Sequence, residues 1–150
     1  MTLRILHWAS RCFLAAVFLY SGYIKIESPL QFAAIIEGYQ LEPVLPAALV
    51  WPIARYFPWF EIALALFLLI GWKIRYVAWV TTAVLLTFIV ILTITLARGI
   101  EANCGCFSFD DPITIRTIIR DGLILIPALF LSFQHRFRRK PGTAETPKTV

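Results

Sequence analysis

The stretch Tyr76–Ala97, YVAWVTTAVLLTFIVILTITLA, contains no charged residue, and it decides the class of protein. An α-helix rises about 1.5 Å per residue, so a run of about 20 apolar residues crosses the ~30 Å hydrocarbon core of a bilayer. The five threonines of the stretch can bond through their hydroxyls to backbone carbonyls or to neighbouring helices. The stretch therefore predicts a membrane-spanning helix whose polar side chains serve packing.

The composition of the whole chain agrees with a membrane protein. Of its 150 residues, 59% are hydrophobic and 15% are charged, and the mean hydropathy is +0.76. A soluble domain of this size needs a more highly charged surface. The net charge of +5 is spread over short loops and one tail, which indicates a topology signal and argues against nucleic-acid binding.

Apolar runs on either side of this stretch complete an all-α architecture. We predict an integral membrane four-helix bundle forming one domain, residues 1–135, and a basic, disordered cytoplasmic tail, residues 136–150. A helix over 30–39 is too short to span and is expected to lie in the membrane interface. The predicted spans are 5–26, 46–72, 76–97 and 115–133.

Prolines and the N-terminal run leave some details of these helices open. The first run also resembles a signal peptide, but no small-x-small cleavage site follows it, so we expect a retained helix. Pro52 and Pro58 predict either a short helix over 46–56 followed by a span from 58 to 72, or one kinked helix. Thr114 or Asp111 is expected to cap the last helix, and Pro127 to kink it.

A polar island, Asn103-Cys104-Gly105-Cys106-Phe107, interrupts the apolar runs and holds two of the three cysteines. Glycine accepts backbone angles that a side chain forbids, so the pair can close a small, strained disulfide open to thiol attack. A structural disulfide or two unreactive thiols is the alternative. A metal site is disfavoured because zinc takes about four ligands, and His7 and His135 lie near the chain ends.

The distribution of charge predicts which way the chain crosses the membrane. Basic residues gather near the termini and in the turn at 73–75, whereas acidic residues gather in the other two loops. By the positive-inside rule both termini are cytoplasmic in the inner membrane, and the cysteine loop, residues 100–112, lies in the periplasm, where disulfides persist. Cys12 then lies too far from the pair to join it, and we expect it to be a small buried packing residue.

Several charged residues fall inside the predicted spans. Glu61 lies on the order of 17 Å along the helix from the turn at 73–75, near the middle of the bilayer, where a bare carboxylate is costly. We expect a polar cluster beneath the cysteine loop in which Lys25 or Arg120 reaches Glu61. The alternative is that Lys25, Arg55 and Arg120 extend to the headgroups and that Asp121 caps a helix. The members proposed for the cluster are Lys25, Glu61, Arg120 and Asp121.

Four motifs together resemble a known family. They are Leu19–Lys25, Pro58-Trp59-Phe60-Glu61, Cys104-Gly105-Cys106-Phe107, and the pair Arg120-Asp121 that opens the last helix. The combination resembles the MauE group of methylamine utilisation proteins, within the DoxX-like membrane proteins, although Ser108 stands where that group often has glycine. The resemblance implies a four-helix membrane bundle, thioredoxin-like partners, and a link to disulfide formation in exported proteins such as methylamine dehydrogenase.

The leading hypothesis is therefore a membrane thiol–disulfide redox protein. Cys104 and Cys106 would exchange disulfides with an external thioredoxin-like partner or an exported client. No cofactor is required by the sequence, and a quinone docked beside the outer ends of the helices is the candidate electron acceptor. One alternative is a non-enzymatic assembly factor or small respiratory subunit with a structural disulfide. A solute carrier that uses Glu61 is disfavoured because no internal repeat is evident.

Overall fold

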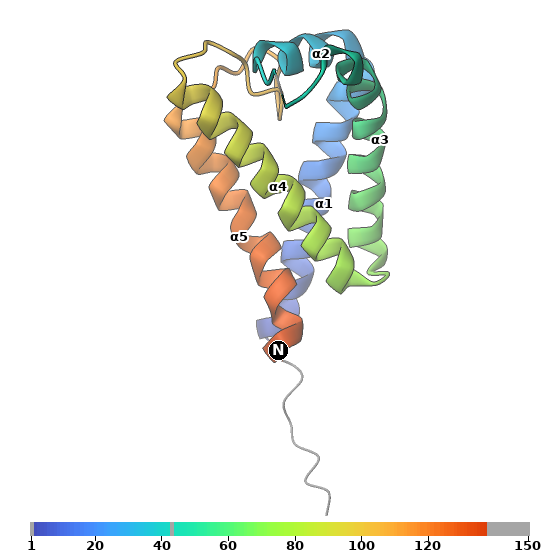
Figure 1. Ribbon diagram of the computed structural model, residues 1–150. Helices are drawn as coiled ribbons and strands as arrows, with labels where there is room; N and C mark the ends of the chain where they lie inside the picture. Colours follow the sequence, from blue (N-terminus) through green and yellow to red (C-terminus); the bar gives the residue numbers. More distant parts are fainter. Residues whose placement is uncertain (1, 43, 138–150) are drawn as a thin grey trace, which may run out of the picture.

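The computed structural model describes residues 2–42 and 44–137, and the side chains of residues 4–42 and 44–134. Within these residues the fold is all-α, with no strand and one isolated β-bridge. Most of the predicted basic tail, residues 138–150, lies outside the described residues. The five helices are α1 (Thr2–Glu27), α2 (Pro29–Gly38), α3 (Ala47–Ile70), α4 (Ile74–Ala97) and α5 (Ile115–Phe137) (Figure 1).

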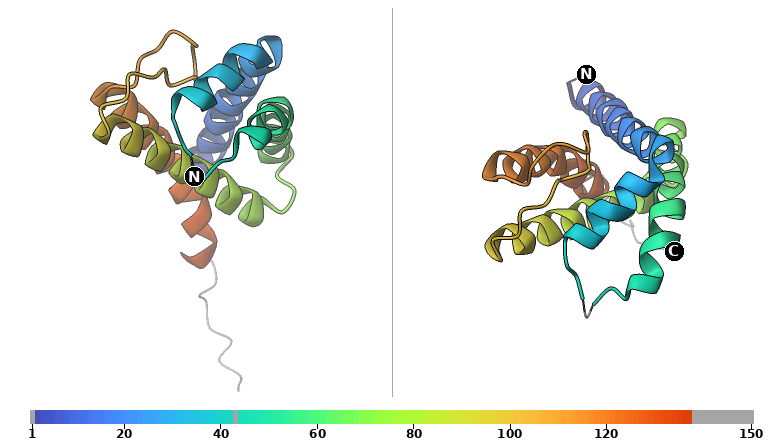
Figure 2. Two further views of the ribbon diagram at one scale, coloured as in Figure 1. Left: turned by 45° about the horizontal axis from the view of Figure 1, so that its top comes forward. Right: turned by 90° about the horizontal axis from the view of Figure 1, so that it is seen from above.

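The four long helices run up and down, with α1 packed against α3 and α4 packed against α5 (Figure 1). Helix α2 and the cysteine loop close one end of the bundle, which we call the loop end (Figure 2). The start of α1 and the end of α5 meet at the opposite, terminal end, where His7 and Gln134 are hydrogen-bonded. His7 therefore lies at the far end of the molecule from the cysteines, as expected from the sequence.

Among the residues that the structure describes, three helical segments are apolar and long enough to cross a membrane: Arg4–Glu27 of α1, α3 and α4. The helices also expose large apolar side chains; Ile70, Trp79 and Val90 are between 44% and 73% exposed. A soluble protein would bury such a surface, whereas lipid accepts it. The chain is accordingly a multi-pass membrane protein. Helix α5, which carries Arg116, Arg120 and Asp121, is not among the three candidate spans.

The core lies where the four long helices converge. Its buried members include Leu14 and Phe18 of α1, Leu68 of α3, and Leu131 of α5.

Helix α3 continues through both of its prolines, so the predicted break between 56 and 58 was wrong and the single-helix alternative holds. Neighbouring helices can compensate a proline inside a membrane helix. At the start of α5, Thr114 Oγ1 accepts a hydrogen bond from the backbone N–H of Thr117, 3.4 Å away, as the capping prediction required.

Near the terminal end, one side chain differs from the prediction and its neighbour makes contacts that were not predicted. Cys12 is exposed, so the expectation of a buried packing residue was wrong. The reason is the helical register: the face of α1 that meets α3 and the core presents Arg11 and Leu14 instead. Arg11 donates from Nε to Leu68 O and from Nη2 to Leu69 O, 2.8 Å each. It therefore satisfies carbonyls at the C-terminus of α3, a role beyond its expected contribution to topology.

Candidate functional site: the cysteine loop and the cavity beneath it

The cysteine loop is held in place by backbone hydrogen bonds and by a tyrosine. Asn103 and Pro112 form the isolated bridge, and the N–H of Cys104 donates to Asp111 O over 2.7 Å. Tyr39, just after α2, donates its hydroxyl to Cys104 O over 2.6 Å. Because the two ends of the loop are joined to each other and Tyr39 holds the backbone of Cys104, this cysteine keeps a defined position over the bundle.

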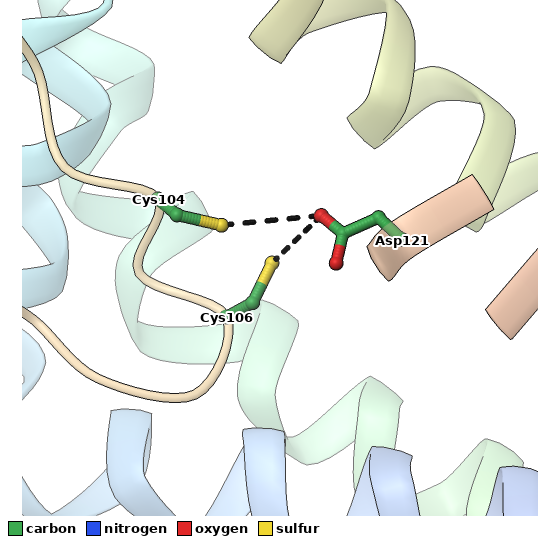
Figure 3. Close-up of side chains that lie close together, drawn as sticks. All are labelled: Cys104, Cys106 and Asp121. Atoms are coloured by element: carbon green, nitrogen blue, oxygen red, sulfur yellow. Dashed lines mark hydrogen bonds between the residues drawn. The ribbon is translucent and has the colours of Figure 1, made fainter. Parts of the chain in front are cut away.

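Gly105 is needed for the shape of the loop. Its φ is +68°, in the left-handed region that disfavours side chains. A Cβ at this position would also lie 3.1 Å from Cδ1 of Ile35 on α2. The glycine therefore lets the loop turn sharply while staying against α2, and the two flanking thiols come to the same side, as Figure 3 shows.

The two sulfurs and a carboxylate form one cluster (Figure 3). Asp121 Oδ2, from the first turns of α5, lies 4.0 Å from Cys104 Sγ and 3.7 Å from Cys106 Sγ. The ligand atoms of these three residues all lie within 4.8 Å of one another, and both thiols are free. A disulfide has an S–S length of about 2.05 Å, so a shift of less than about 3 Å would join the sulfurs.

The two cysteines differ in exposure. Cys104 is fully buried and Cys106 is half-buried. The expectation that both sulfurs lie open to thiol attack was therefore wrong for Cys104, whose backbone is pinned between Tyr39 and Asp111. Cys106 is thus the less buried residue of the pair and the better placed of the two for an incoming thiol.

Arg120 places a positive charge beside the buried sulfur. Its Nη2 lies 3.6 Å from Cys104 Sγ, while Nη1 binds Asp111 Oδ2 over 2.8 Å and Nε binds Asp121 Oδ1 over 3.3 Å. The guanidinium also stacks 4.6 Å over the ring of Phe107. These contacts hold the cation in one orientation, with one edge toward the sulfur, where it favours a thiolate.

The surroundings separate the acidities of the two thiols. A hydrogen bond from the Cys106 thiol, helped by the backbone N–H of Cys106 and by Arg120, lowers the pKa of Cys104 against the opposing effects of burial and Asp121. Burial raises the pKa of Cys106 well above its usual range, and the hydrogen bond to Cys104 adds to that rise. Of the two thiols in the reduced pair, Cys104 is therefore the one that ionises first, and Cys106 holds its proton to higher pH.

A second polar group lies deeper in the bundle. Lys25 of α1 binds both carboxylate oxygens of Glu61 of α3, at 2.8 and 2.9 Å, and Ser21 Oγ at 2.9 Å. Of the two cations expected to reach Glu61, Lys25 does so and Arg120 does not. Gly22 permits the contact, because a Cβ there would lie 3.0 Å from Pro58 O. Arg55, by contrast, is exposed and belongs to neither group.

One cavity of about 40 Å³ joins the two polar groups. This space accommodates a few water molecules, whereas benzene binds in an engineered cavity of about 150 Å³. A quinone ring therefore has no room in it, and the quinone acceptor considered from the sequence would have to dock elsewhere. The polar residues that line the cavity are Ser21, Lys25, Glu61, Cys106 and Asp121.

Cys104, Cys106 and Asp121 are also a possible set of metal ligands. Structural zinc sites have four protein ligands, and zinc sites with three protein ligands add a water. Arg120 already places its charge against Cys104 and Asp121, which disfavours a cation at the same place. The expectation of no metal remains a prediction.

Comparison with known proteins gives the family. A family model described as methylamine utilisation protein MauE matches residues 3–134. This chain belongs to the MauE family. The resemblance found in the four motifs is thereby confirmed, and the family is one of methylamine utilisation. No solved structure matches the chain.

Two curated MauE proteins are similar to this chain. The one from Paracoccus denitrificans is 27% identical over 128 residues, which cover 83% of this chain and 67% of that protein. The one from Methylophilus methylotrophus is 30% identical over 95 residues, which cover 63% of this chain and 48% of that protein. The chain thus spans two thirds of one MauE relative and about half of the other.

Proposed function

We propose that this MauE-family chain is a membrane thiol–disulfide exchange protein whose working group is the Cys104–Cys106 pair. The observation that carries the proposal is the asymmetry of the pair: Cys106 is the less buried residue, and a guanidinium lies 3.6 Å from Sγ of the fully buried Cys104. In thiol–disulfide exchange the attacked sulfur must be reachable, and a leaving sulfur of low pKa departs faster. The arrangement assigns these two roles to different cysteines.

The proposed reaction runs from the oxidised pair. A thiolate of an exported dithiol client, or of a thioredoxin-like partner, attacks Cys106 Sγ, the Cys104–Cys106 bond breaks, and the electron pair leaves on Cys104 as a thiolate beside Arg120. The second thiolate of the client then attacks the client sulfur in the mixed disulfide and releases Cys106. The client loses two electrons and forms its disulfide, while the cysteine pair gains them.

The proposed orientation is four spans with both termini in the cytoplasm and the cysteine loop in the periplasm. Helix α5 runs beside α4 to the terminal end (Figure 1), and it exposes a stripe of apolar residues, Ile119, Leu123 and Ile126, each about 60% exposed. These features support α5 as a fourth span whose charges lie near the loop end. The basic turn at 73–75 and the acidic loop end support the direction.

This orientation can be tested with engineered cysteines in a chain that lacks its own three. In cells whose outer membrane has been removed and whose inner membrane is intact, a membrane-impermeant maleimide should label Ser108→Cys. It should label Arg75→Cys only after the inner membrane is permeabilised. The reverse pattern would place the cysteine loop in the cytoplasm, where the proposed exchange has no exported client.

In this setting the pair would support the maturation of periplasmic disulfide proteins, methylamine dehydrogenase among them. The alternative is a non-enzymatic assembly factor or a small respiratory subunit in which the cysteines only stabilise the loop. The complete burial of Cys104 and its fixed backbone favour that alternative. The incomplete burial of Cys106 and the charge beside Cys104 favour exchange.

The deciding experiment uses the oxidised full-length Cys12→Ser protein in detergent and a reduced peptide with two cysteines. We expect one peptide disulfide for each Cys104–Cys106 pair that becomes reduced, and no peptide oxidation by Cys104→Ser or Cys106→Ser. With a peptide activated as a mixed disulfide, Cys104→Ser should capture a covalent adduct faster than Cys106→Ser. A folded protein that leaves the peptide reduced would support the structural alternative.

A further inference from the structure

The exchange reaction above leaves one buried ionic group without a role. Lys25 is 1% exposed and Glu61 is 5% exposed, and they form a salt bridge of 2.8 Å. Withdrawing two charges from water costs several kcal/mol for each ion, so such a pair is often no more stabilising than apolar residues of the same size. Stability alone is therefore a poor reason for an ion pair at this place.

The position of the pair suggests what it acts on. Lys25 and Glu61 line the same small cavity as Cys106, and most of the remaining wall is apolar, formed by residues such as Phe18, Phe57 and Phe88. Coulomb interactions are much stronger in such surroundings than in water. The part of the Lys25 ammonium charge that Glu61 does not neutralise is therefore weakly screened between Lys25 and Cys106.

The charged groups around the two sulfurs divide between them. Arg120, from α5, lies against Cys104, whereas the cation that shares the cavity with Cys106 is Lys25, from α1. The acidic neighbours are Asp121 from α5, 3.7 Å from Cys106, and Glu61 from α3, bound to Lys25. Helix α4 lines the cavity with apolar side chains, and the titratable group next to α2, Tyr39, binds the carbonyl of Cys104.

We propose that Lys25 is a positioning residue for the exchange reaction. Its ammonium, held by Glu61 and Ser21 at the cavity that Cys106 also lines, stabilises the negative charge that appears on Cys106 Sγ when the mixed disulfide with the client is cleaved. The electron pair of that sulfur–sulfur bond goes to Cys106, which then takes a proton from water. The role rests on the proposed function, and it explains why each sulfur of the pair has its own cation.

The energetics of Cys106 agree with this assignment. Burial, Cys104 and Asp121 all raise the pKa of Cys106, and the charge of Lys25 acts in the opposite direction. Without Lys25, the thiolate of Cys106 would leave into an apolar cavity with only carboxylates and another sulfur beside it. Glu61 then sets how much of the ammonium charge Cys106 experiences, because it neutralises part of that charge.

The test is the pH dependence of alkylation of Cys106 by iodoacetamide in the full-length Cys12→Ser/Cys104→Ser protein. Lys25→Met should raise the titration midpoint and slow alkylation at neutral pH by up to about tenfold, which is one pKa unit. Glu61→Gln should lower the midpoint and accelerate alkylation, and Lys25→Arg should stay close to the starting protein. Glu27→Gln, an exposed acid near the end of α1, is the matched control and should change nothing.

A purely structural ion pair predicts a different result, namely that Lys25→Met and Glu61→Gln move the midpoint in the same direction or leave it unchanged. Because either single change could unfold the chain, the exchanged pair Lys25→Glu/Glu61→Lys is the second variant. It keeps the salt bridge but turns a carboxylate toward Cys106, so it should slow alkylation. Alkylation at the starting rate would overturn the proposal. No partner protein is used, so the outcome is independent of whether exchange occurs.

Discussion

Replacing Arg120 by methionine removes the guanidinium that lies 3.6 Å from Cys104 Sγ. Two unit charges at that distance interact by about 1 kcal/mol at the dielectric constant of water and by about 4 to 5 kcal/mol at an effective value of about 20. The Arg120 side chain is 36% exposed, so the lower part of this range applies, about 1 to 2 kcal/mol. This corresponds to about one pKa unit.

We therefore expect Arg120→Met to raise the pKa of the Cys104 thiol by about one unit. The direction follows because Arg120 stabilises the thiolate, and its loss also leaves Asp121 with one cation fewer. Arg120→Lys keeps the charge without the two-sided contact with the carboxylates and should give a smaller rise.

The assay is thiolate absorbance against pH in the reduced Cys12→Ser protein, in which Cys104 and Cys106 are the two remaining cysteines. A second measurement, the rate at which the oxidised protein reacts with a small thiol, should fall with Arg120→Met because the leaving thiolate is less stable. If folded Arg120→Met keeps both the thiolate titration and the rate of reaction with the small thiol at their starting values, the role assigned to Arg120 is refuted.

Three other substitutions test the scaffold. Gly22→Ala should destabilise the protein by about 1 to 3 kcal/mol because its Cβ would press against the backbone of α3. The control Gly122→Ala, with nothing within 4 Å of the new Cβ, should shift the melting temperature little, and equal shifts of the melting temperature in the two variants would contradict this. Gly105→Ala should slow closure of the Cys104–Cys106 disulfide, measured by loss of free thiols, because position 105 has a φ of +68° and the new Cβ would meet Ile35. An unchanged rate of closure would contradict this and show that the loop relaxes. Arg11→Met should lower thermal stability by about 2 to 4 kcal/mol, since two charged hydrogen bonds to the end of α3 are lost, and Arg11→Lys should lose less.

The sequence predicted the helices better than it predicted their contacts. Apolar length and turn residues located α1, α2, α4 and α5 to within a few residues of the predicted runs, since these signals are local. The continuity of α3 was not decided by its prolines, because packing against neighbouring helices can outweigh a lost hydrogen bond.

The side-chain contacts depend on how the helices pair, which the sequence does not state. The motifs containing Lys25 and Glu61 were recognised, but 36 positions separate these residues, and their pairing had to be chosen from two candidates. Beyond an aromatic and a basic residue at helix ends, nothing in the sequence signalled the hydrogen bond from Tyr39 to Cys104 or the cap that Arg11 makes on α3. Cys12 was misplaced for the same reason: its exposure is set by which face of α1 meets α3.

The central claim is that Cys104 and Cys106 form a disulfide that exchanges readily with external thiols. The direct measurement is the fraction of free thiols in the detergent-solubilised Cys12→Ser protein after equilibration with glutathione or dithiothreitol buffers of graded potential. The account predicts one two-electron transition at a potential above about −300 mV, the range of labile disulfides. A pair that stays oxidised below that potential, or that never forms a disulfide at any buffer ratio, would contradict it.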